Sequence, residues 1–293
     1  MFLSGTYYDV DKHLLDISLH SDIPKQYYSL KDKVFEDWEI PPWEIHIFKD
    51  RLLGEGGFSK VYLAKWRETF VVAKIINTEI IKTKKELVLR EIDIMSKLHH
   101  PNIVQFLGYV NNPFILVMEY IPQGNLRDNI SKLYKSQKIT IMKDILKALA
   151  YFHNRKPHSL IHRDIKPTNV LLTNSKVAKI TDFGLSKFYK LDNISSFDNL
   201  TNIETNNSLT KEVGTEKYMA PEILNREIYD NKIDIYACGI LFFEMFENKR
   251  YVRGIDNSFW YTPYKLRNLI KDNMLNDDST KRKTALELLK IIN

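Results

Sequence analysis

One short polar stretch constrains this chain more than any other. The segment IHRDIKPTN, residues 161–169, is followed thirteen residues after its last residue by DFG, residues 182–184. Asp164 can accept a proton from an attacking hydroxyl, while Asn169 and Asp182 can hold magnesium against the phosphates of a nucleotide. Either string alone can arise by chance. Both together, with the glycine-rich stretch GEGG at residues 54–57 upstream, indicate phosphoryl-transfer chemistry.

Length and composition predict an ordered globular protein. With 293 residues the chain can form one large domain or two lobes with a substantial apolar core. The 16 Tyr, 15 Phe and 4 Trp argue against a disordered chain. A net charge of +6 permits acidic partners, but the basic residues look scattered, so nucleic-acid binding is the less favoured interpretation.

The cysteine and apolar content predict a soluble cytoplasmic protein without a membrane segment. Cys238 is the single cysteine, which allows no disulfide framework and suits a reducing compartment. The longest apolar run, Ile235 to Phe246, is interrupted by Glu244 and is too short to span a bilayer. The first residues match neither a secretory signal nor a myristoylation signal, which would need glycine where Phe2 stands.

The order of the periodic segments predicts strands first and helices afterwards. Residues 45–76 are rich in β-branched and aromatic residues on both sides of the glycine-rich stretch, and residues 104–110 and 114–120 predict two further strands. Helical spacing of apolar residues predicts helices over 83–98 and 139–153. Residues 191–210, which are dense in Asn, Ser and Thr, predict a loop.

This order predicts an α+β architecture with two lobes. We expect residues 1–45 to be an extension or linker. Residues 46–121 would form a small lobe with an antiparallel sheet and one main helix. Residues 122–293 would form a larger, mostly helical lobe.

The complete set of motifs resembles the eukaryotic-type protein kinase catalytic domain. The match runs from about Ile45 to the C-terminus and includes the glycine loop, a strand lysine, a helix glutamate, the catalytic loop, DFG and the stretch GTEKYMAPE at residues 214–222. The stretch WEIPP, residues 38–42, is similar to the lead-in of the tyrosine-kinase-like group of Ser/Thr kinases. The resemblance implies a bilobal fold, ATP and Mg2+ as cofactors, and Ser/Thr hydroxyls of proteins as substrates.

The resemblance also implies the nucleotide contacts. Lys74 would contact the α- and β-phosphates and would be oriented by an ion pair with Glu91. Met118 would guard the back of the adenine pocket, and the backbone of Glu119 to Ile121 would pair with adenine. The full set expected to contact the nucleotide is Leu53, Gly54, Glu55, Gly56, Gly57, Phe58, Ser59, Val61, Val72, Lys74, Glu91, Met118, Glu119, Ile121 and Leu171.

Two positions depart from the family pattern. Ser59 stands at the position of the third glycine of the loop. Val72 stands where the family usually has alanine, two residues before the lysine, and its additional methyl groups would press on the adenine ring. We therefore expect weaker nucleotide affinity or an altered fit of inhibitors.

The catalytic roles implied by the resemblance fall on three residues. Asp164 would align the substrate hydroxyl and accept its proton, although a free aspartate is a poor base near neutral pH. Positioning and charge stabilisation would therefore carry more of the rate. Lys166 would neutralise charge on the transferred phosphoryl group. The Thr215 hydroxyl would form hydrogen bonds with both Asp164 and Lys166. Asn169 and Asp182 would hold the metal.

Other residues have expected structural roles. His162 and Phe183 would belong to an apolar column continued by Met95 and Phe106. Asp234 would hydrogen-bond the backbone of the catalytic loop. Glu222 and Arg282 would form a buried ion pair that supports the segment between DFG and APE. Cys238 would be a buried core residue.

Regulation and docking complete the expectations. In the family, an arginine at the place of Arg163 often binds a phosphate on the activation segment, and Thr210 and Ser208 are the preferred phosphorylation sites, autocatalytic or by an activating kinase. The connection from Phe246 to Tyr264 is shorter than in the family, where it normally contains an extra docking helix. Two alternatives stay open: a catalytically weak kinase fold acting as a binding scaffold, and a dual-specificity or tyrosine-directed kinase.

Overall fold

The computed structural model describes residues 36–57, 59–156, 158–189, 216–255 and 257–292. It divides into two compact units. The first contains the chain up to His99 together with Val104–Tyr120, and the second contains His100–Ile103 and the chain from Ile121 onward. The predicted extension up to residue 35 and the predicted loop at 191–210 lie outside the described residues. Within the described part, no helix combines the length and apolarity that crossing a membrane requires.

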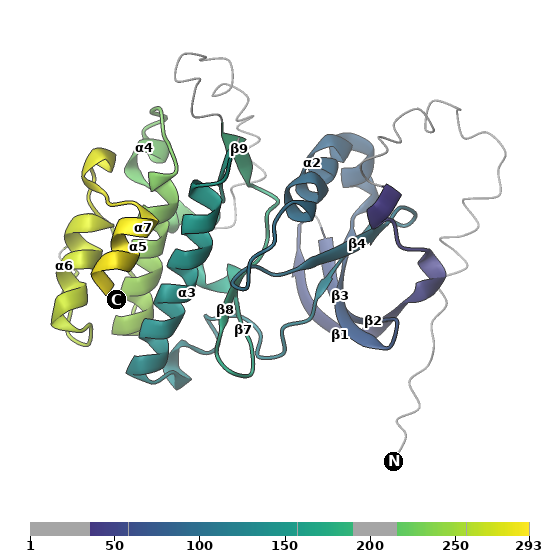
Figure 1. The fold of residues 1–293 in the computed structure, drawn as a ribbon, viewed down its shortest axis with the longest axis horizontal. Helices are drawn as coiled ribbons and strands as arrows, with labels where there is room; N and C mark the ends of the chain where they lie inside the picture. Colours follow the sequence, from purple (N-terminus) through teal and green to yellow (C-terminus); the bar gives the residue numbers. More distant parts are fainter. Residues whose placement is uncertain (1–35, 58, 157, 190–215, 256, 293) are drawn as a thin grey trace. The chain divides into compact units, whose positions relative to one another are not determined.

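The first unit is built on a five-stranded antiparallel sheet (Figure 1). Its strands pair in the order β1-β2-β3-β5-β4, and one long helix, α2, accompanies them. The bounds are β1 Ile45–Gly56, β2 Ser59–Trp66, β3 Thr69–Ile76, α2 Thr78–Ser96, β4 Phe106–Val110 and β5 Ile115–Glu119. The strand-rich stretch predicted from residue 45 to 76 is therefore confirmed, as are the two later strands, with slightly shorter bounds.

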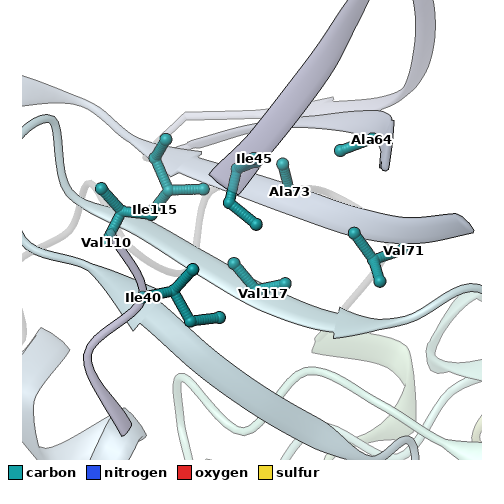
Figure 2. Packing of buried hydrophobic residues seen from close by; sticks show 8 residues of the cluster. All are labelled: Ile40, Ile45, Ala64, Val71, Ala73, Val110, Ile115 and Val117. Atoms are coloured by element: carbon teal, nitrogen blue, oxygen red, sulfur yellow. The ribbon is translucent and has the colours of Figure 1, made fainter. Parts of the chain in front are cut away.

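The two faces of this sheet have different roles. Along β3, side chains alternate, so Val71 and Ala73 point to one face while Val72 and Lys74 point to the other. Figure 2 shows the apolar cluster on the first face, to which β1, β2, β4 and β5 also contribute residues. The cluster consists of Ile40, Ile45, Ala64, Val71, Ala73, Val110, Ile115 and Val117. The opposite face is thus left for the polar groups described in the next section.

Ile40 and Ile45 are part of this core, although residues 1–45 were predicted to be an extension or linker. Ile40 is 4% exposed and donates its backbone N–H to the carbonyl of Tyr109 at 2.8 Å. This close approach needs a glycine at 108, because a Cβ there would lie 2.6 Å from the carbonyl oxygen of Trp38. The burial of Ile40 could not be predicted from the sequence, because a single apolar residue before two prolines shows no periodicity.

Helix α2 begins five residues earlier than the apolar spacing predicted. Asn77 caps it, since its side-chain oxygen accepts a hydrogen bond from the backbone N–H of Glu79 at 3.0 Å. The predicted start at Thr83 followed the buried stripe, but the cap fixes the first turn before that stripe begins.

The second unit is mostly helical, which together with the sheet-based unit confirms the predicted α+β fold class. Helix α3 packs against α5, α7 and two of the short strands. Two small antiparallel sheets, β6 with β9 and β7 with β8, accompany the helices. The bounds are α3 Lys135–His153, β6 Ser159–Ile161, β7 Val170–Leu172, β8 Ala178–Ile180, β9 Lys187–Tyr189, α4 Pro221–Leu224, α5 Lys232–Glu247, α6 Tyr264–Asn273 and α7 Ala285–Ile292.

Helix α5 is the central element of this unit. All its residues after Lys232 are buried, as expected for a helix that is apolar on every side. It ends where Asn248 adopts a left-handed conformation with φ 52°. The described residues between α5 and α6 contain no helix.

We predict that Ile40→Ala destabilises the first unit. Removing a buried isoleucine side chain should lower the free energy of unfolding by about 2–4 kcal/mol. Trp43→Ala is the matched control, because Trp43 is 85% exposed and its loss should change stability by less than about 0.5 kcal/mol. Urea unfolding followed by far-UV circular dichroism measures both. Equal destabilisation by the two substitutions would contradict the packing of residues 38–45.

Candidate active site

In the first unit, β3 and α2 bring Lys74 and Glu91 together. The Lys74 Nζ lies 2.7 Å from Oε1 of Glu91, and the two side chains are only 15% and 8% exposed. A pair shielded from water in this way is costly to break, because either charge alone would be left poorly solvated. The expected ion pair is therefore present, and it holds the ammonium group in a fixed place on the sheet.

The β1–β2 hairpin carries the glycine loop. Gly54 pairs with Val61 and Gly56 pairs with Ser59, which places Gly57 in the turn. A Cβ added at any of the three glycines would meet nothing within 4 Å. The space above these glycines is therefore free of neighbouring atoms, so a ligand can approach the backbone closely. Phe58, also expected to contact the nucleotide, lies outside the described residues.

The residues expected to surround adenine lie on the sheet face that carries Lys74. Val61 is paired with Lys74, and Val72 is paired with Leu63 on one side and Met118 on the other. Val72 is 9% exposed. Of the remaining expected contacts, Leu53 and Glu55 lie in β1 and Glu119 ends β5, whereas Ile121 and Leu171 belong to the second unit.

In the second unit, Asp164 is held from two sides. Its Oδ2 accepts hydrogen bonds from the Lys166 Nζ at 2.9 Å and from the Asn169 Nδ2 at 2.8 Å. Its other oxygen, Oδ1, is buried and has no hydrogen-bond partner among the described residues. Oδ2 is thus fixed by its neighbours, while Oδ1 can accept a hydrogen bond from a substrate hydroxyl.

The β7–β8 hairpin places Asn169 opposite the residue that precedes Asp182, the other expected metal ligand. Val170 pairs with Ile180, and just beyond this pair the N–H of Thr181 donates to the carbonyl of Asn169 at 3.0 Å. Asp182 follows directly and adopts φ 67°, a conformation that a non-glycine residue holds only when its surroundings impose it. Phe183, which is 1% exposed, anchors the next position.

These two side chains fit a magnesium ion. Both Nδ2 hydrogens of Asn169 are directed to Asp164, which leaves the amide oxygen of Asn169 for another partner. Amide and carboxylate oxygens are the ligands that Mg2+ prefers. The described residues contain no group of three or more His, Cys, Asp or Glu suited to a metal. Magnesium bound together with phosphates needs only one or two such ligands from the protein.

A buried carboxylate on α5 supports the catalytic loop. Asp234 accepts the backbone N–H groups of His162 and Arg163, each at 2.8 Å, and contacts the Nε2 of His153 at 3.0 Å. Burial alone raises the pKa of Asp234, but the hydrogen bonds from His153 and His162 outweigh it and hold the pKa below its ordinary value of 3.8. Asp234 is therefore an ionised anchor at neutral pH.

Around this anchor, the loop geometry is unusual. Arg163 adopts φ 68°, and its side chain donates to the carbonyl of Leu185 and to the hydroxyl of Tyr229. His162 is fully buried, with its ring 5.0 Å from that of Phe183 in an edge contact. His162 thus has the packing role that the sequence predicted. Met95 and Phe106, the other expected members of its column, belong to the first unit.

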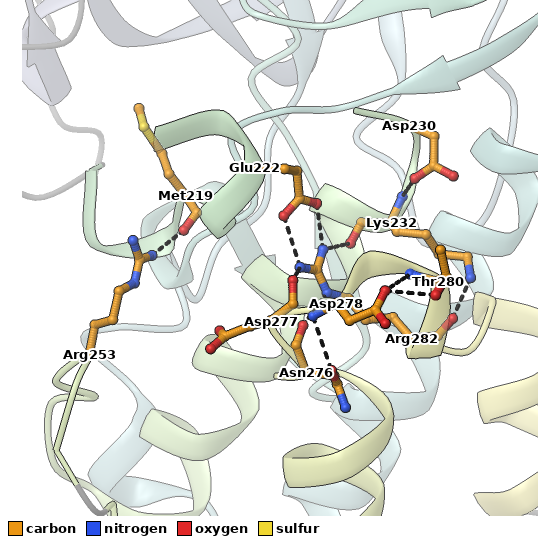
Figure 3. A network of polar contacts seen from close by, with 10 residues as sticks. All are labelled: Met219, Glu222, Asp230, Lys232, Arg253, Asn276, Asp277, Asp278, Thr280 and Arg282. Atoms are coloured by element: carbon orange, nitrogen blue, oxygen red, sulfur yellow. Dashed lines mark hydrogen bonds and ion pairs between the residues drawn. The ribbon is translucent and has the colours of Figure 1, made fainter. Parts of the chain in front are cut away.

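Figure 3 shows the buried ion pair of Glu222 and Arg282. The two guanidinium nitrogens of Arg282 donate to the two carboxylate oxygens of Glu222 at 2.6 and 2.8 Å. The guanidinium also lies 4.8 Å from the ring centre of Tyr236 on α5. This pair ties α4 to the segment before α7, as the sequence predicted.

Some functional residues were missed or are not described. His153 was not predicted to reach Asp234, because the last turn of an amphipathic helix gives no sign of a partner 81 residues away. Asn102, which is 3% exposed and donates to the carbonyl of Ala178, was missed for the same reason. Thr215, Thr210 and Ser208 lie outside the described residues.

Comparisons with known proteins agree on one family. The model of the protein kinase domain matches residues 48–292. The chain is 36% identical over 224 residues to the serine/threonine-protein kinase VIK of Arabidopsis thaliana, covering 73% of this chain and 48% of VIK. It is 36% identical over 200 residues to the putative serine/threonine-protein kinase/receptor R826 of Acanthamoeba polyphaga mimivirus, covering 66% of this chain and 11% of R826.

A third relative is the serine/threonine-protein kinase CTR1 of Arabidopsis thaliana. The identity is 32% over 219 residues, which cover 72% of this chain and 25% of CTR1. The chain thus spans about half or less of the length of these relatives.

We predict that Asp234→Asn destabilises the second unit. The amide would place a donor among N–H groups and remove the charge that they solvate, at a cost of about 3–5 kcal/mol. Asp272→Asn on exposed α6 is the control and should be nearly neutral. Urea unfolding measures both.

The pH dependence of this effect follows from the lowered pKa of Asp234. A carboxylate with a lowered folded-state pKa contributes its stability above the unfolded pKa and loses it as the pH falls through the folded pKa. The difference in the free energy of unfolding between the parent and Asp234→Asn should therefore stay constant from about pH 5 to 8. It should become smaller only in stronger acid. A difference that shrinks between neutrality and pH 5 would contradict an ionised anchor.

Proposed function

We propose that this chain, which belongs to the protein kinase domain family, is an active enzyme that transfers the γ-phosphoryl group of Mg-ATP to serine and threonine hydroxyls of proteins. The arrangement of Asp164 carries the proposal. Its Oδ2 is held by Lys166 and Asn169, and its buried Oδ1 has no hydrogen-bond partner among the described residues. A buried polar atom without a partner is costly, so its presence supports a role that a substrate completes.

The transfer would proceed as follows. The substrate hydroxyl donates its hydrogen bond to Oδ1 of Asp164 and attacks the γ-phosphorus. The bond between the γ-phosphorus and the oxygen bridging to the β-phosphate breaks, ADP leaves, and the hydroxyl proton passes to Asp164. Since an aspartate is a weak base, its main contribution is to align the hydroxyl. Lys166, 2.9 Å from Asp164, would balance charge on the moving phosphoryl group.

Binding groups in each unit support the same reaction. In the first unit, Lys74, oriented by Glu91, would contact the α- and β-phosphates, and the backbone of the unobstructed glycine loop would approach the phosphate oxygens. In the second unit, Asn169 and Asp182 would hold magnesium. The metal would neutralise negative charge on the phosphates during transfer.

The serine/threonine preference rests on the catalytic loop and on the relatives. Lys166, two residues after Asp164, is typical of Ser/Thr kinases, and VIK and CTR1 are both named as such. A catalytically weak scaffold is the second candidate, which the departure at Val72 keeps open. Thr210 and Ser208 are proposed as sites of activating phosphorylation.

We predict that Asp164→Asn removes phosphoryl transfer while leaving nucleotide binding intact. Incubation with labelled ATP, magnesium and a generic protein substrate should show transfer falling by about 10^2- to 10^4-fold. Asp182→Asn should lose transfer as well, through weaker metal binding, and Asp272→Asn should keep it. Phosphoamino-acid analysis of the parent's product should show phosphoserine and phosphothreonine.

The contrary outcomes separate the alternatives. A parent that binds ATP but transfers no phosphate would support the scaffold. Phosphotyrosine as a major product would support dual specificity. An Asp164→Asn variant as active as the parent would refute the assigned role.

We predict that Val72→Ala tightens ATP binding. Removing methyl groups that press on the adenine ring should improve affinity by about fivefold, equivalent to about 1 kcal/mol. Val71→Ala is the matched control, because Val71 points to the apolar cluster on the other face of the same strand. Calorimetric titration with ATP measures both. Affinity of Val72→Ala equal to or lower than that of the parent would count against the steric hypothesis.

A further inference from the structure

Residues between α5 and the end of α6 carry a local excess of positive charge. Residues 248–271 contain six basic residues and one acidic residue, a net charge of +5 in a chain whose total is +6. The basic residues are Lys249, Arg250, Arg253, Lys265, Arg267 and Lys271. This stretch lies outside the groups assigned to phosphoryl transfer and needs a separate explanation.

The same stretch exposes aromatic side chains. Trp260, Tyr261 and Tyr264 are 73%, 72% and 76% exposed. They are three of the five most exposed large apolar or aromatic side chains in the described part of the chain. Single exposed rings are common, but three within five consecutive residues form a patch, and such patches mark interaction sites.

A buried carboxylate fixes the backbone at two of the rings, Trp260 and Tyr261. Glu247, the last residue of α5, is 3% exposed. Its carboxylate accepts the backbone N–H groups of Trp260, Tyr261 and Thr262 at 2.8, 3.1 and 2.8 Å, and also the hydroxyl of Thr262. The backbone of Trp260 and Tyr261 is therefore fixed by the core, which reduces the backbone entropy that this segment would lose on binding.

Two of the cations are hydrogen-bonded to the backbone of the same segment. Arg267 donates to the carbonyls of Thr262 and Trp260 at 2.9 and 3.4 Å, and Lys249 donates to the carbonyl of Ser258 at 2.9 Å. Lys265 follows Tyr264 in the first turn of α6. We call Trp260, Tyr261, Tyr264, Lys249, Lys265 and Arg267 the aromatic-basic surface.

We propose that the aromatic-basic surface binds an acidic segment of a partner protein that also carries apolar side chains. Trp, Tyr and Arg are the residues most enriched at the energetic centres of protein interfaces, and rigid rings lose little entropy on binding. The net charge of +5 selects an acidic partner and disfavours pairing with a second copy of the same surface.

The test uses calorimetric titration of the whole chain, without ATP, with three synthetic peptides. The probe has four Glu-Glu-Leu-Phe repeats. One control replaces Glu by Lys, and the other replaces Leu-Phe by Gly-Ser. The probe should bind at least about tenfold more tightly than either control, since both charge and apolar contact contribute. Its affinity should fall as salt is raised.

Variants then locate the site. Trp260→Ala and Tyr264→Ala should each weaken binding of the probe by about tenfold or more. Lys265→Glu should weaken it and reduce the salt dependence. Trp43→Ala is the matched control, because it removes a tryptophan that is 85% exposed elsewhere and should leave binding unchanged. Glu247→Gln should weaken binding although every ring is retained. Thermal denaturation and phosphoryl transfer to a generic substrate, expected to be unchanged in Trp260→Ala, separate this result from misfolding and from catalysis.

Several outcomes would overturn the proposal. These are no binding of the probe, equal binding of a control peptide, or full affinity in both Trp260→Ala and Tyr264→Ala. Anionic phosphatidylserine vesicles or single-stranded oligonucleotides that bind through the same residues while the probe does not would assign the surface to a different class of partner.

Discussion

The hydrogen bonds of Asp234 are the interaction on which the rest of the second unit's candidate site depends. A charge buried in α5 is tolerated only because His153 and two backbone N–H groups of the catalytic loop solvate it. The same bonds hold Arg163 at a positive φ. Asp164 is the next residue in the chain, so the anchor fixes the backbone position from which the Asp164 carboxylate extends. The β7–β8 register then brings Asn169 to that carboxylate.

The surrounding polar groups differ from the reactive one in a single respect. Glu222 and Asp234 are buried, and both carboxylate oxygens of each accept hydrogen bonds, so each fixes a segment of the second unit. Asp164 is engaged through Oδ2, and its buried Oδ1 has no hydrogen-bond partner within the described part of the chain. In a folded protein a buried acceptor without a partner is rare, which distinguishes a group prepared for a substrate from groups that stabilise the scaffold.

The sequence could predict what depends on local pattern and on motif. The strands of the first unit, helix α3 and the Lys74–Glu91 pair follow from periodicity or from fixed spacing. It could not predict contacts whose partners have no local signal. Ile40 is a single apolar residue that packs into the core, and Asn77 begins α2 with a side-chain cap. His153 contacts Asp234, which lies 81 residues later in the chain. Such contacts depend on tertiary geometry, which no window of sequence contains.

Helix α5 carries three buried carboxylates that stabilise the second unit in the same way. Asp234, Glu244 and Glu247 are buried carboxylates on an otherwise apolar helix, and each accepts hydrogen bonds from a different segment of the second unit. Burial and the contact with Glu244 raise the pKa of Tyr218, so this phenol stays a donor. A buried charge must find its donors or the fold loses several kcal/mol, so each carboxylate specifies which segment docks and in what register. The Glu247 contact is the instructive one, because the segment that it fixes presents rings to water, and packing of the unit's own core gives no reason for that.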